Sequence, residues 1–295
     1  MIEVQKGERK FPFSEGIMAK SLTGCGLSVS EAYEIVREIR GILQTRRVQK
    51  VSSGKLKEMI SENLLQRGHG TEERFYRVRR QIRYLDEPLF IVIGGGPGVG
   101  KSSISSELGH RLGIDRVIGS DTVREIMRSI ISPGLIPTLH ESTFKAGDVL
   151  KTSLVTDKLI YAFEQQTSLV CEGIAAVMRR GAKEGLHMIL NGVHIVPGFL
   201  RPILEDKLRY VFQYVINVPD PQQHILYFHL REESAQREAD RYVKQIDRIR
   251  RQQDYILRMA EQNDVPIIDN MDFERSLRTI LEDIISQIEK EVSDE

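Results

Sequence analysis

The stretch from Gly95 to Ser102 has the residue types and spacing of a phosphate-binding loop. It reads GGPGVGKS and fits the pattern GxxxxGK[ST], between an apolar run and a helical pattern. Glycines let backbone N–H groups turn inward around a β-phosphate, and the positive N-terminal end of the following helix adds to that attraction. Lys101 would carry its cation to the β- and γ-phosphates, and Ser102 would ligate Mg²⁺. The alternative is a glycine-rich turn at a sheet edge.

This pattern predicts a Walker A loop that binds ATP together with Mg²⁺. ATP is favoured over GTP because no NKxD-type guanine motif follows in the sequence. The expected nucleotide-binding residues are consecutive: Gly95, Gly96, Pro97, Gly98, Val99, Gly100, Lys101, Ser102 and Ser103.

A carboxylate and two guanidinium groups follow the next candidate strand. Asp121, Arg124 and Arg128 stand three and four residues apart, so on a helix they project from one side, beside the phosphate-binding loop. A carboxylate near the γ-phosphate can orient an acceptor hydroxyl and take its proton, and arginines can hold an anionic substrate bidentately. We therefore expect Asp121 to be the base and all three residues to bind the substrate. The alternative is a helix N-cap followed by ordinary surface arginines.

More cations precede a long charged helical stretch near the C-terminus. Arg231, Arg237 and Arg241 would form a mobile lid that neutralises charge on the transferring phosphoryl group and excludes water. These three arginines are therefore expected to act in catalysis with Lys101 and Asp121. Because acidic residues interleave with the arginines, a solvated helix is the alternative.

Alternating strands and helices must position these groups. Five short apolar runs are typical of strands buried on both faces. They are Leu89–Ile93, Arg116–Ile118, His187–Leu190, Tyr210–Val218 and Val265–Ile268. Helical patterns fill the gaps at 102–112, 122–131 and 273–290, with two more helices expected within 141–183. The alternation predicts an α/β fold with a parallel sheet covered on both faces and a ligand site at the carboxyl ends of its strands.

The first 87 residues predict a separate, mainly helical domain. Ser28 and Glu31 have capping-box spacing at the start of an apolar stripe, and a second helix is expected over 55–66. The stripe consists of Val29, Ala32, Val36, Ile39 and Leu43. The arginine-rich segment 67–87 is interpreted as a charged linking helix. We therefore expect one domain at 1–87 and the α/β domain at 88–295.

The composition excludes several classes of protein. Of the 295 residues 40% are hydrophobic, and 42 Lys and Arg balance 42 Asp and Glu, which disfavours disorder and a protein built to neutralise nucleic-acid phosphates. No apolar run reaches the length of a membrane span and no signal peptide opens the chain, so we expect a cytoplasmic protein without a membrane or nucleic-acid partner. Cys25 and Cys171 stand far apart without metal-ligand spacing and are expected to be buried thiols.

Several segments together resemble the 2-phosphoglycerate kinase family. They are the strand-loop-helix around GGGPGVGKS, then GSDTVREIMR, ILNGVHIVPGF, RYVKQIDRIRRQQDYI and VPIIDN. The segment VQKGERKFPFSEGIMAKSLTGCGLSVSEAYEIVREI resembles the ATP-cone module that precedes the kinase in that family. The resemblance covers almost the whole chain. The Walker A loop is shared by many families, whereas the stretch 192–199 and the pairing with an ATP-cone are more specific.

The resemblance implies a P-loop kinase fold of three α/β/α layers, like that of nucleoside monophosphate kinases, after an ATP-cone-like domain. It also implies ATP- and magnesium-dependent phosphorylation of 2-phosphoglycerate to 2,3-bisphosphoglycerate, the precursor of cyclic 2,3-diphosphoglycerate, a solute associated with thermoadaptation. This small acceptor carries a carboxylate, a phosphate and a primary hydroxyl, so Arg179, Arg180 or Arg201 could add cations to those already named. The implied partners are this substrate and ATP, and a homo-oligomer is possible through the N-terminal domain.

One residue departs from the family pattern, and two other functions stay open. Asn191 ends the third strand, where related P-loop kinases commonly have an acid; an amide can bond a magnesium-bound water but brings no negative charge. His194 follows as a candidate substrate ligand or a structural histidine. A zeta-toxin-like kinase of a nucleotide sugar would need an aromatic-lined pocket, and only 6% of the residues are aromatic. The third possibility is a nucleotide-sensing regulator that binds ATP in both domains.

Overall fold

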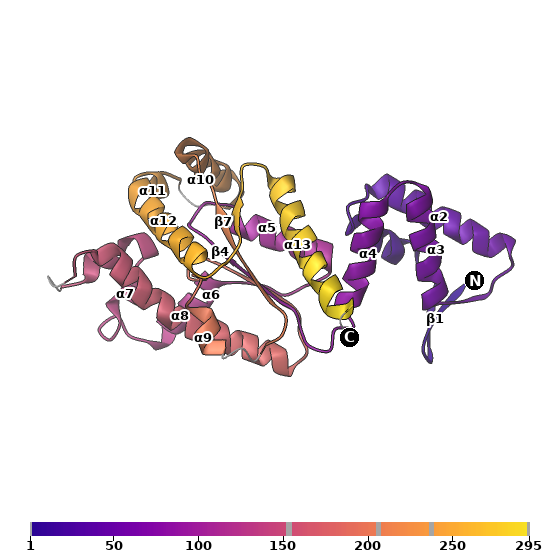
Figure 1. The fold of residues 1–295 in the computed structure, drawn as a ribbon, viewed down its shortest axis with the longest axis horizontal. Coiled ribbons are helices and arrows are strands. Elements are labelled where there is room, and N and C mark those ends of the chain that lie inside the picture. Colours follow the sequence, from indigo (N-terminus) through magenta and orange to yellow (C-terminus); the bar gives the residue numbers. More distant parts are fainter. Residues whose placement is uncertain (1, 152–154, 205–207, 236–238, 294–295) are drawn as a thin grey trace. The chain divides into compact units, whose positions relative to one another are not determined.

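The computed structural model describes residues 2–151, 155–204, 208–235 and 239–293 (Figure 1). The chain forms two compact units, each described here by itself. Unit 1 comprises Met1–Leu85, His110–Gly113 and Ile285–Glu295, and unit 2 comprises Asp86–Gly109 and Ile114–Ile284. The division after Leu85 lies close to the boundary expected from the sequence, but unit 1 also takes the ends of two helices that belong in sequence to the second domain.

Unit 1 contains a three-stranded sheet that the sequence did not predict. Its strands are β1 (Glu3–Lys6), β2 (Arg9–Pro12) and β3 (Lys50–Ser52), in the order β2-β1-β3. β1 pairs antiparallel with β2 across a two-residue turn at Gly7, where φ is +59°, and parallel with β3. All four residues of β2 are exposed, so no apolar alternation marks it in the sequence. The prediction of a mainly helical domain is therefore corrected to a mixed one.

The helices of unit 1 follow the predicted pattern more closely. They are α1 (Glu15–Thr23), α2 (Val29–Thr45), α3 (Ser53–Gln66) and α4 (Gly70–Ile82). The capping box is confirmed, because the N–H of Glu31 donates to Ser28 Oγ and the N–H of Ser28 donates to Glu31 Oε2. The apolar stripe of α2 is buried except for Val29, which is 66% exposed because it lies in the first turn, before the helix reaches the core.

The segment 67–87 is not merely a charged linker. Its helix α4 buries Tyr76, Val78 and Ile82, and Tyr76 belongs to the hydrophobic core of unit 1. Two of its arginines pair with Glu289 near the end of the last helix: Arg74 at 2.6 Å and Arg77 at 3.0 Å. The charged face and the apolar face therefore lie on the same helix.

Removal of the α2 cap should loosen the start of that helix. Ser28→Ala takes away the acceptor for the Glu31 amide, and we expect hydrogen exchange of the first-turn amides of α2 to rise about fivefold in the full chain. Ser30→Ala is the matched control, since Ser30 is exposed in the same turn and is not the cap. Equal exchange in the two variants, measured by mass spectrometry, would contradict a stabilising cap.

The predicted parallel sheet is confirmed in unit 2. All five expected strands are present, with ends shifted by one or a few residues. They are β4 (Phe90–Gly94), β5 (Val117–Gly119), β6 (Met188–Asn191), β7 (Val211–Asn217) and β8 (Ile267–Asp269). All pair in parallel in the order β5-β6-β4-β7-β8. Every residue of β4 is buried, as its central place in the sheet requires.

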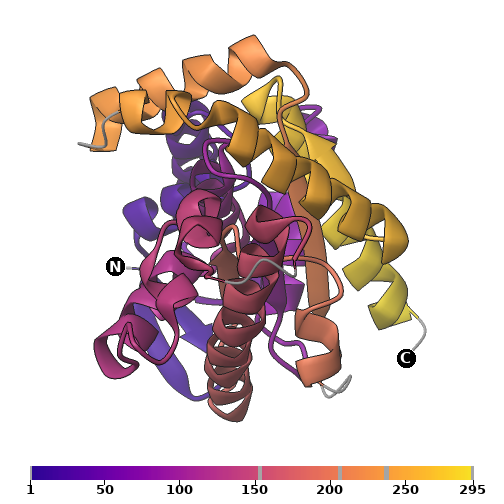
Figure 2. The same cartoon turned by 90° about the vertical axis from the view of Figure 1, so that its left-hand side faces the viewer.

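Helices connect these strands. In chain order they are α5 (Lys101–Leu112), α6 (Ser120–Ile130), α7 (Pro137–His140), the 3₁₀ helix η1 (Thr143–Val149), α8 (Lys158–Lys183), α9 (Leu200–Leu204), α10 (Pro221–Ala235), α11 (Ala239–Val243), α12 (Ile246–Gln262) and α13 (Phe273–Ser293). Of the two helices expected within 141–183, one is the short η1 and the other is the long α8. Figure 2 shows the orange segment α10 to α12 running together along one side of unit 2.

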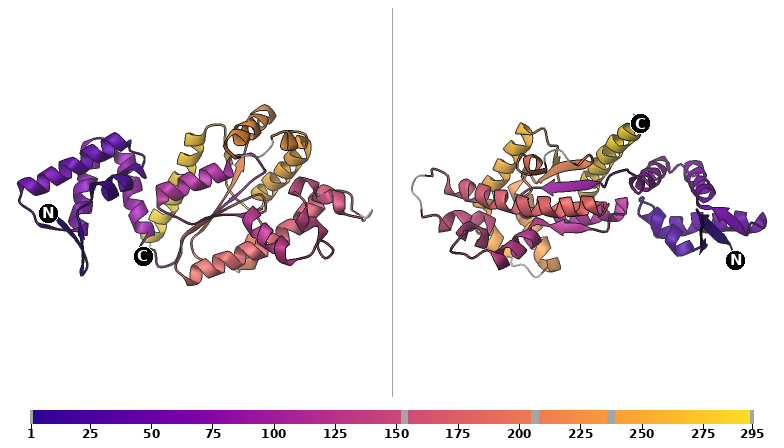
Figure 3. Two further views of the ribbon diagram at one scale, coloured as in Figure 1. Left: turned by 180° about the vertical axis from the view of Figure 1, so that it is seen from behind. Right: turned by 90° about the horizontal axis from the view of Figure 1, so that it is seen from below.

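Helices cover both faces of the sheet. On one face Val123 of α6 and Ile174 of α8 share a core cluster with Phe90 of β4. On the other face lie α5 and the first part of α13 (Figure 3), where Tyr214 of β7 donates a 2.7 Å hydrogen bond to Asp283 Oδ2. Because the strands are parallel, the loops after β4, β5, β6 and β7 meet at one edge of the sheet.

The remaining sequence predictions concern membranes and thiols. No helix among the described residues is long and apolar enough to cross a bilayer. Cys25 and Cys171 are buried free thiols, as predicted. Burial raises the pKa of Cys25 to about 11 and that of Cys171 to about 12, so both stay protonated and unreactive.

Candidate active site

The glycine-rich loop connects β4 to α5 at the carboxyl edge of the sheet. Gly95, Gly98 and Gly100 have φ values of +135°, +82° and +90°, which L side chains rarely adopt. A Cβ on Gly98 would also lie 2.6 Å from the ring of Phe228, and one on Gly100 would lie 2.4 Å from the Asn270 amide. These glycines are therefore required by the turn and by close neighbours, which matches the predicted phosphate-binding loop.

Lys101 folds back over this loop. Its side chain is buried, with 8% of the residue exposed, and its Nζ donates a 2.5 Å hydrogen bond to the carbonyl oxygen of Gly96. The ammonium group is thus held next to the loop's backbone amides, where both would face a polyphosphate. Ser102 and Ser103 follow in the first turn of α5 and line the cavity described below.

Three side chains from distant elements brace the loop, and the sequence analysis did not single out any of them. Gln253 of α12 accepts from the N–H of Gly96 and donates to the backbone oxygen of Ile216, 3.2 Å away. His224 of α10 donates a 2.7 Å bond to the Pro97 oxygen, and burial lowers its pKa, so the ring is neutral. The side-chain amide of Asn270, which follows β8, donates a 3.0 Å bond to Val99. Such bracing keeps the loop in one conformation.

Only Gln253 leaves a readable signal in the sequence. It lies between Ile249 and Ile256 on the buried face of α12, where an apolar residue would be expected. A buried glutamine needs hydrogen-bond partners, and here it finds them in the loop and in β7. His224 and Asn270 carry no comparable local pattern.

A cavity of about 530 Å³ opens beside the loop in unit 2. Its walls come from the glycine loop, the start of α6, the turn before and into η1, the residues after β6, and α10, α11 and the start of α13. The lining residues are Pro97, Gly98, Gly100, Lys101, Ser102, Ser103, Gly119, Ser120, Asp121, Thr122, Arg124, Ser142, Thr143, Phe144, Asn191, Gly192, Val193, Tyr227, Leu230, Tyr242, Asn270 and Phe273. The volume is that of an ordinary small-molecule site.

Asp121 and Arg124 lie on the cavity wall, whereas Arg128 lies outside it. The Arg124 Nε is 3.7 Å from Asp121 Oδ1, and its Nη1 donates a 2.6 Å bond to the carbonyl oxygen of Glu141. Arg128 pairs instead with Glu125 at 2.7 Å and is absent from the described lining. One carboxylate and one guanidinium therefore face the cavity from α6, rather than the three charged groups expected from spacing.

His194 does not line the cavity in the described part of the chain. It is fully buried behind Ser120, and its two ring nitrogens bond to Ser120 and to Gln166. Burial lowers the pKa of His194 to about 3, so the ring is neutral. Direct contact between His194 and a substrate, which the sequence suggested, is not what this geometry offers. The structural alternative fits better.

Of the three arginines expected to form a lid, the structure describes the side chain of Arg241. Arg241 of α11 donates a 2.8 Å hydrogen bond to the hydroxyl of Ser142, a residue of the cavity wall. The side chain of Arg231, in α10, lies outside the described side chains, and Arg237 lies outside the described residues altogether. Only Arg241 can therefore be placed beside the cavity.

The other candidate cations lie elsewhere. Arg179 donates to the backbone oxygen of Ile203, and Arg180 pairs with Glu184. Neither these two arginines nor Arg201 belongs to the described cavity lining. They are not placed to bind a ligand next to the glycine loop.

Comparison with known proteins decides the family. No family model matches the chain. The 2-phosphoglycerate kinase of Thermococcus kodakarensis is 41% identical over 292 residues, which cover 98% of this chain and 99% of that protein. The chain belongs to the 2-phosphoglycerate kinase family. The 2-phosphoglycerate kinase of Methanopyrus kandleri is 37% identical over 98% of this chain and 88% of its own length. The family resemblance read from the motifs is thereby confirmed.

A solved structure gives a weaker comparison. The shikimate kinase of Acinetobacter baumannii matches 70% of this chain and 97% of its own, with 12% identity and a TM-score of 0.42. A score this low carries no argument about this chain.

The departure at Asn191 can now be seen in this member of the 2-phosphoglycerate kinase family. Asn191 lies at the end of β6, and its Oδ1 accepts a 3.4 Å hydrogen bond from Ser102 Oγ. Both residues line the cavity, and the described residues hold no group of three or more His, Cys, Asp or Glu side chains placed to hold a metal ion. Neutral hard oxygens suit Mg²⁺, which commonly takes one or two protein ligands and completes its shell with phosphate oxygens and water. The residues present therefore fit a Mg²⁺ ion.

Aromatic side chains gather in the cavity despite their low overall number. Phe144, Tyr227, Tyr242 and Phe273 all line it, and Phe144 and Tyr242 meet edge to face with ring centroids 5.8 Å apart. A low aromatic content therefore does not exclude an aromatic-lined pocket, because position rather than composition decides what lines a site.

Proposed function

We propose that this chain transfers the γ-phosphoryl group of ATP to the 3-hydroxyl of 2-phosphoglycerate, giving 2,3-bisphosphoglycerate and ADP. The observation that carries the proposal is the cavity itself, whose wall combines the glycine loop and Lys101 with Asp121 and Arg124. The near full-length identity to 2-phosphoglycerate kinases supports the choice of acceptor. The product would be the precursor of cyclic 2,3-diphosphoglycerate.

We assign unit 2 to the P-loop kinase fold and its loop to the phosphates of ATP. The strand order, with the loop-bearing β4 in the centre, supports this assignment. Backbone amides of Gly95 to Ser103 would surround the β-phosphate, and Lys101 would leave the Gly96 carbonyl to follow the γ-phosphate. Charge that spreads over the transferring group would then meet a cation held in a buried site.

On the acceptor side, Asp121 is the proposed base and Arg124 the proposed anion ligand. The carboxylate would orient the 3-hydroxyl and receive its proton as the new bond to phosphorus forms and the bond to the leaving oxygen of ADP breaks. The guanidinium would hold the carboxylate or phosphate of the acceptor bidentately. Arg241, already bonded to Ser142 on the wall, is the proposed lid cation. Arg128 pairs with Glu125 and has no geometric support for its expected role, whereas the roles of Arg231 and Arg237 stay predictions.

Mg²⁺ would be held by the Ser102 hydroxyl, with Asn191 next to it as the partner of a metal-bound water. When bound, the metal neutralises charge on the β- and γ-phosphates. Because Asn191 supplies no negative charge, its side chain would contribute less to the affinity for the metal than an acidic side chain at this position would.

Three further assignments rest on the resemblance. Residues 1–87 are proposed to be an ATP-cone-like module, whose Lys6 and Gly7 lie at the β1–β2 hairpin. Assembly into a homo-oligomer through this unit and a cytoplasmic location remain predictions. None of them affects the chemistry proposed for unit 2.

A panel of acceptors tests the proposed reaction. The full chain with ATP and Mg²⁺ is offered 2-phosphoglycerate, 3-phosphoglycerate, glycerate and a nucleotide sugar in turn, and ADP formation is followed by a coupled assay. We expect turnover with 2-phosphoglycerate alone. Turnover only with the nucleotide sugar would favour the zeta-toxin-like alternative, for which the aromatic lining is the observation. ATP binding without turnover of any acceptor would favour the nucleotide-sensing regulator.

A further inference from the structure

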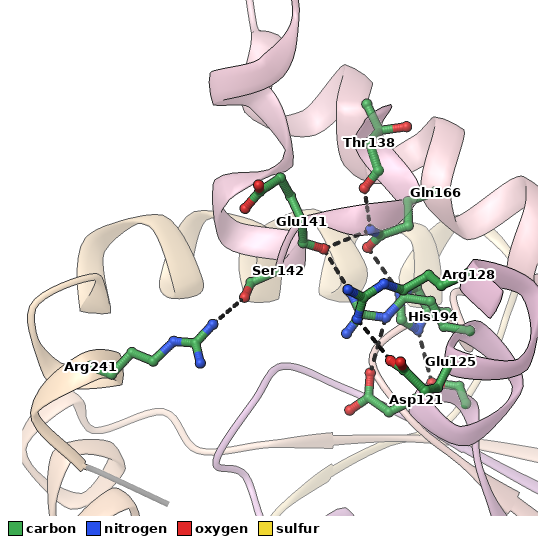
Figure 4. Close-up of polar contacts among 11 residues, drawn as sticks. Asp121, Glu125, Arg128, Thr138, Glu141, Ser142, Gln166, His194 and Arg241 are labelled. Carbon is green, nitrogen blue, oxygen red and sulfur yellow. Dashed lines mark hydrogen bonds and ion pairs between the residues drawn. The ribbon is translucent and has the colours of Figure 1, made fainter. Parts of the chain in front are cut away.

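A buried chain of hydrogen bonds runs behind the acceptor side of the cavity (Figure 4). It starts at Ser120, whose Oγ lies 2.9 Å from Nδ1 of His194, and continues over 3.0 Å from His194 Nε2 to Oε1 of Gln166. The Gln166 amide nitrogen then donates to the backbone oxygens of Thr138 and Glu141, at 2.6 and 3.0 Å. Gln166 and His194 are both fully buried, and they come from α8 and from the turn after β6.

The two backbone oxygens bonded to Gln166 determine which atoms donate and which accept along this series of hydrogen bonds. The two backbone oxygens can only accept, so Gln166 Nε2 uses both of its hydrogens and Oε1 must be the acceptor for His194. His194 therefore carries its hydrogen on Nε2. Since burial lowers the pKa of His194 to about 3, the ring is neutral and Nδ1 accepts from the Ser120 hydroxyl. The Ser120 hydrogen thus points toward His194, which holds this residue of the cavity wall in one orientation.

The same series of hydrogen bonds also positions Arg124. The Glu141 oxygen accepts from Gln166 and, at 2.6 Å, from Arg124 Nη1. Arg124 lines the cavity, and the next residue after Glu141 is Ser142, which also lines it. Two groups on the acceptor wall, a guanidinium and a serine oxygen, therefore depend on one buried amide.

We propose that Gln166 and His194 are positioning residues for the acceptor. Through the Glu141 carbonyl they hold Arg124 where it meets an anionic group, and through Ser120 they fix the start of α6 next to Asp121. Neither residue touches the substrate. The proposal rests on the proposed function, because it takes 2-phosphoglycerate as the acceptor. The glycine loop has separate braces in Gln253, His224 and Asn270, so the effect is confined to the acceptor side.

Gln166→Met tests this role with Thr167→Val as its matched control. Methionine keeps the length of the side chain and removes all of its hydrogen bonds. Thr167 is the next residue on α8, equally buried, and its hydroxyl has no hydrogen-bond partner among the described residues. We expect the KM for 2-phosphoglycerate to rise at least about tenfold in Gln166→Met, with the KM for ATP within about twofold of the starting value. Thr167→Val should leave both constants within about twofold.

Two results would overturn the proposal: equal KM values for 2-phosphoglycerate in the two variants, or a parallel rise of both KM values in Gln166→Met. Should Gln166→Met fail to fold, Gln166→Glu keeps the length and the acceptor for His194 while removing the amide donor, and the same selective rise is expected. An unchanged KM in that variant also overturns it. Failure of the proposed function looks different, because the unmodified chain would then not turn over 2-phosphoglycerate at all.

A double variant tests the route through Arg124. If Gln166 acts through Arg124, adding Gln166→Met to Arg124→Lys should raise the KM for 2-phosphoglycerate less than about threefold beyond Arg124→Lys alone. If the two increases in the KM for 2-phosphoglycerate multiply in full, Gln166 does not act through Arg124.

Discussion

Lys101→Met should lower turnover at least about 100-fold without unfolding the chain. The lysine is the only charged side chain that the glycine loop itself supplies, and its Nζ already lies against the Gly96 carbonyl. Methionine fills a similar volume but brings no charge to the γ-phosphate as it is transferred. Loss of a buried, pre-positioned cation that stabilises charge in the transition state typically costs two orders of magnitude or more. The measurement is kcat with saturating ATP and 2-phosphoglycerate.

Lys183→Met is the matched control for this prediction. Lys183 is exposed in the last turn of α8 and does not belong to the described cavity lining, so its variant should keep full turnover. Far-UV circular dichroism and thermal unfolding would establish that both variants are folded. A folded Lys101→Met variant with near-normal kcat would remove the reason for placing a triphosphate on this loop.

Local signals made the donor side of the site predictable. The apolar run before Gly94 and the loop pattern are contiguous in sequence, and Gly95, Gly98 and Gly100 meet a local need for positive φ. The last helix was equally predictable, since the helical pattern expected over 273–290 forms α13. In both cases the neighbouring residues that form the sequence pattern are the ones that form the structural element.

The other features depend on contacts between residues far apart in sequence, so no local pattern predicts them. β1 pairs with β3, which lies more than forty residues later, and neither strand is long enough to show alternation. The braces Gln253, His224 and Asn270 reach the loop from helices and turns far along the chain. The sequence spacing also predicted that Arg128 would lie beside Arg124 on the cavity wall, but Arg128 forms an ion pair with Glu125. Nothing local distinguishes an arginine that faces a cavity from one that finds a neighbouring carboxylate.

His194 illustrates the same limit. Its place after β6 correctly indicated proximity to the site, because the carboxyl ends of parallel strands meet there. Whether its ring faced the cavity depended on Ser120 and Gln166, which come from two other elements. Gly192 adds to this arrangement, since a Cβ there would lie 1.8 Å from Ser120 Oγ.

Asp121→Asn should also lower turnover at least about 100-fold, for a different reason. Asparagine has the same shape but cannot take the proton of the acceptor hydroxyl, and general bases contribute two to four orders of magnitude. The Asp121 side chain lies on the cavity wall, is 61% exposed and lies 3.7 Å from Arg124. Because Asp121 belongs to α6, whereas the glycine loop is braced by Gln253, His224 and Asn270, we expect the KM for ATP to stay within about threefold. The measurements are kcat and both KM values.

Glu125→Gln is the matched control, because it makes the same chemical change on the same helix. Glu125 pairs with Arg128, its side chain is 67% exposed, and it does not belong to the described lining of the cavity. Its variant should retain nearly full turnover. If Asp121→Asn and Glu125→Gln are equally active, the proton must leave by another path and Asp121 is not the base. If both lose activity equally, the charge of α6 rather than a positioned carboxylate supports the reaction. Only a selective loss in Asp121→Asn agrees with a base that receives the proton directly.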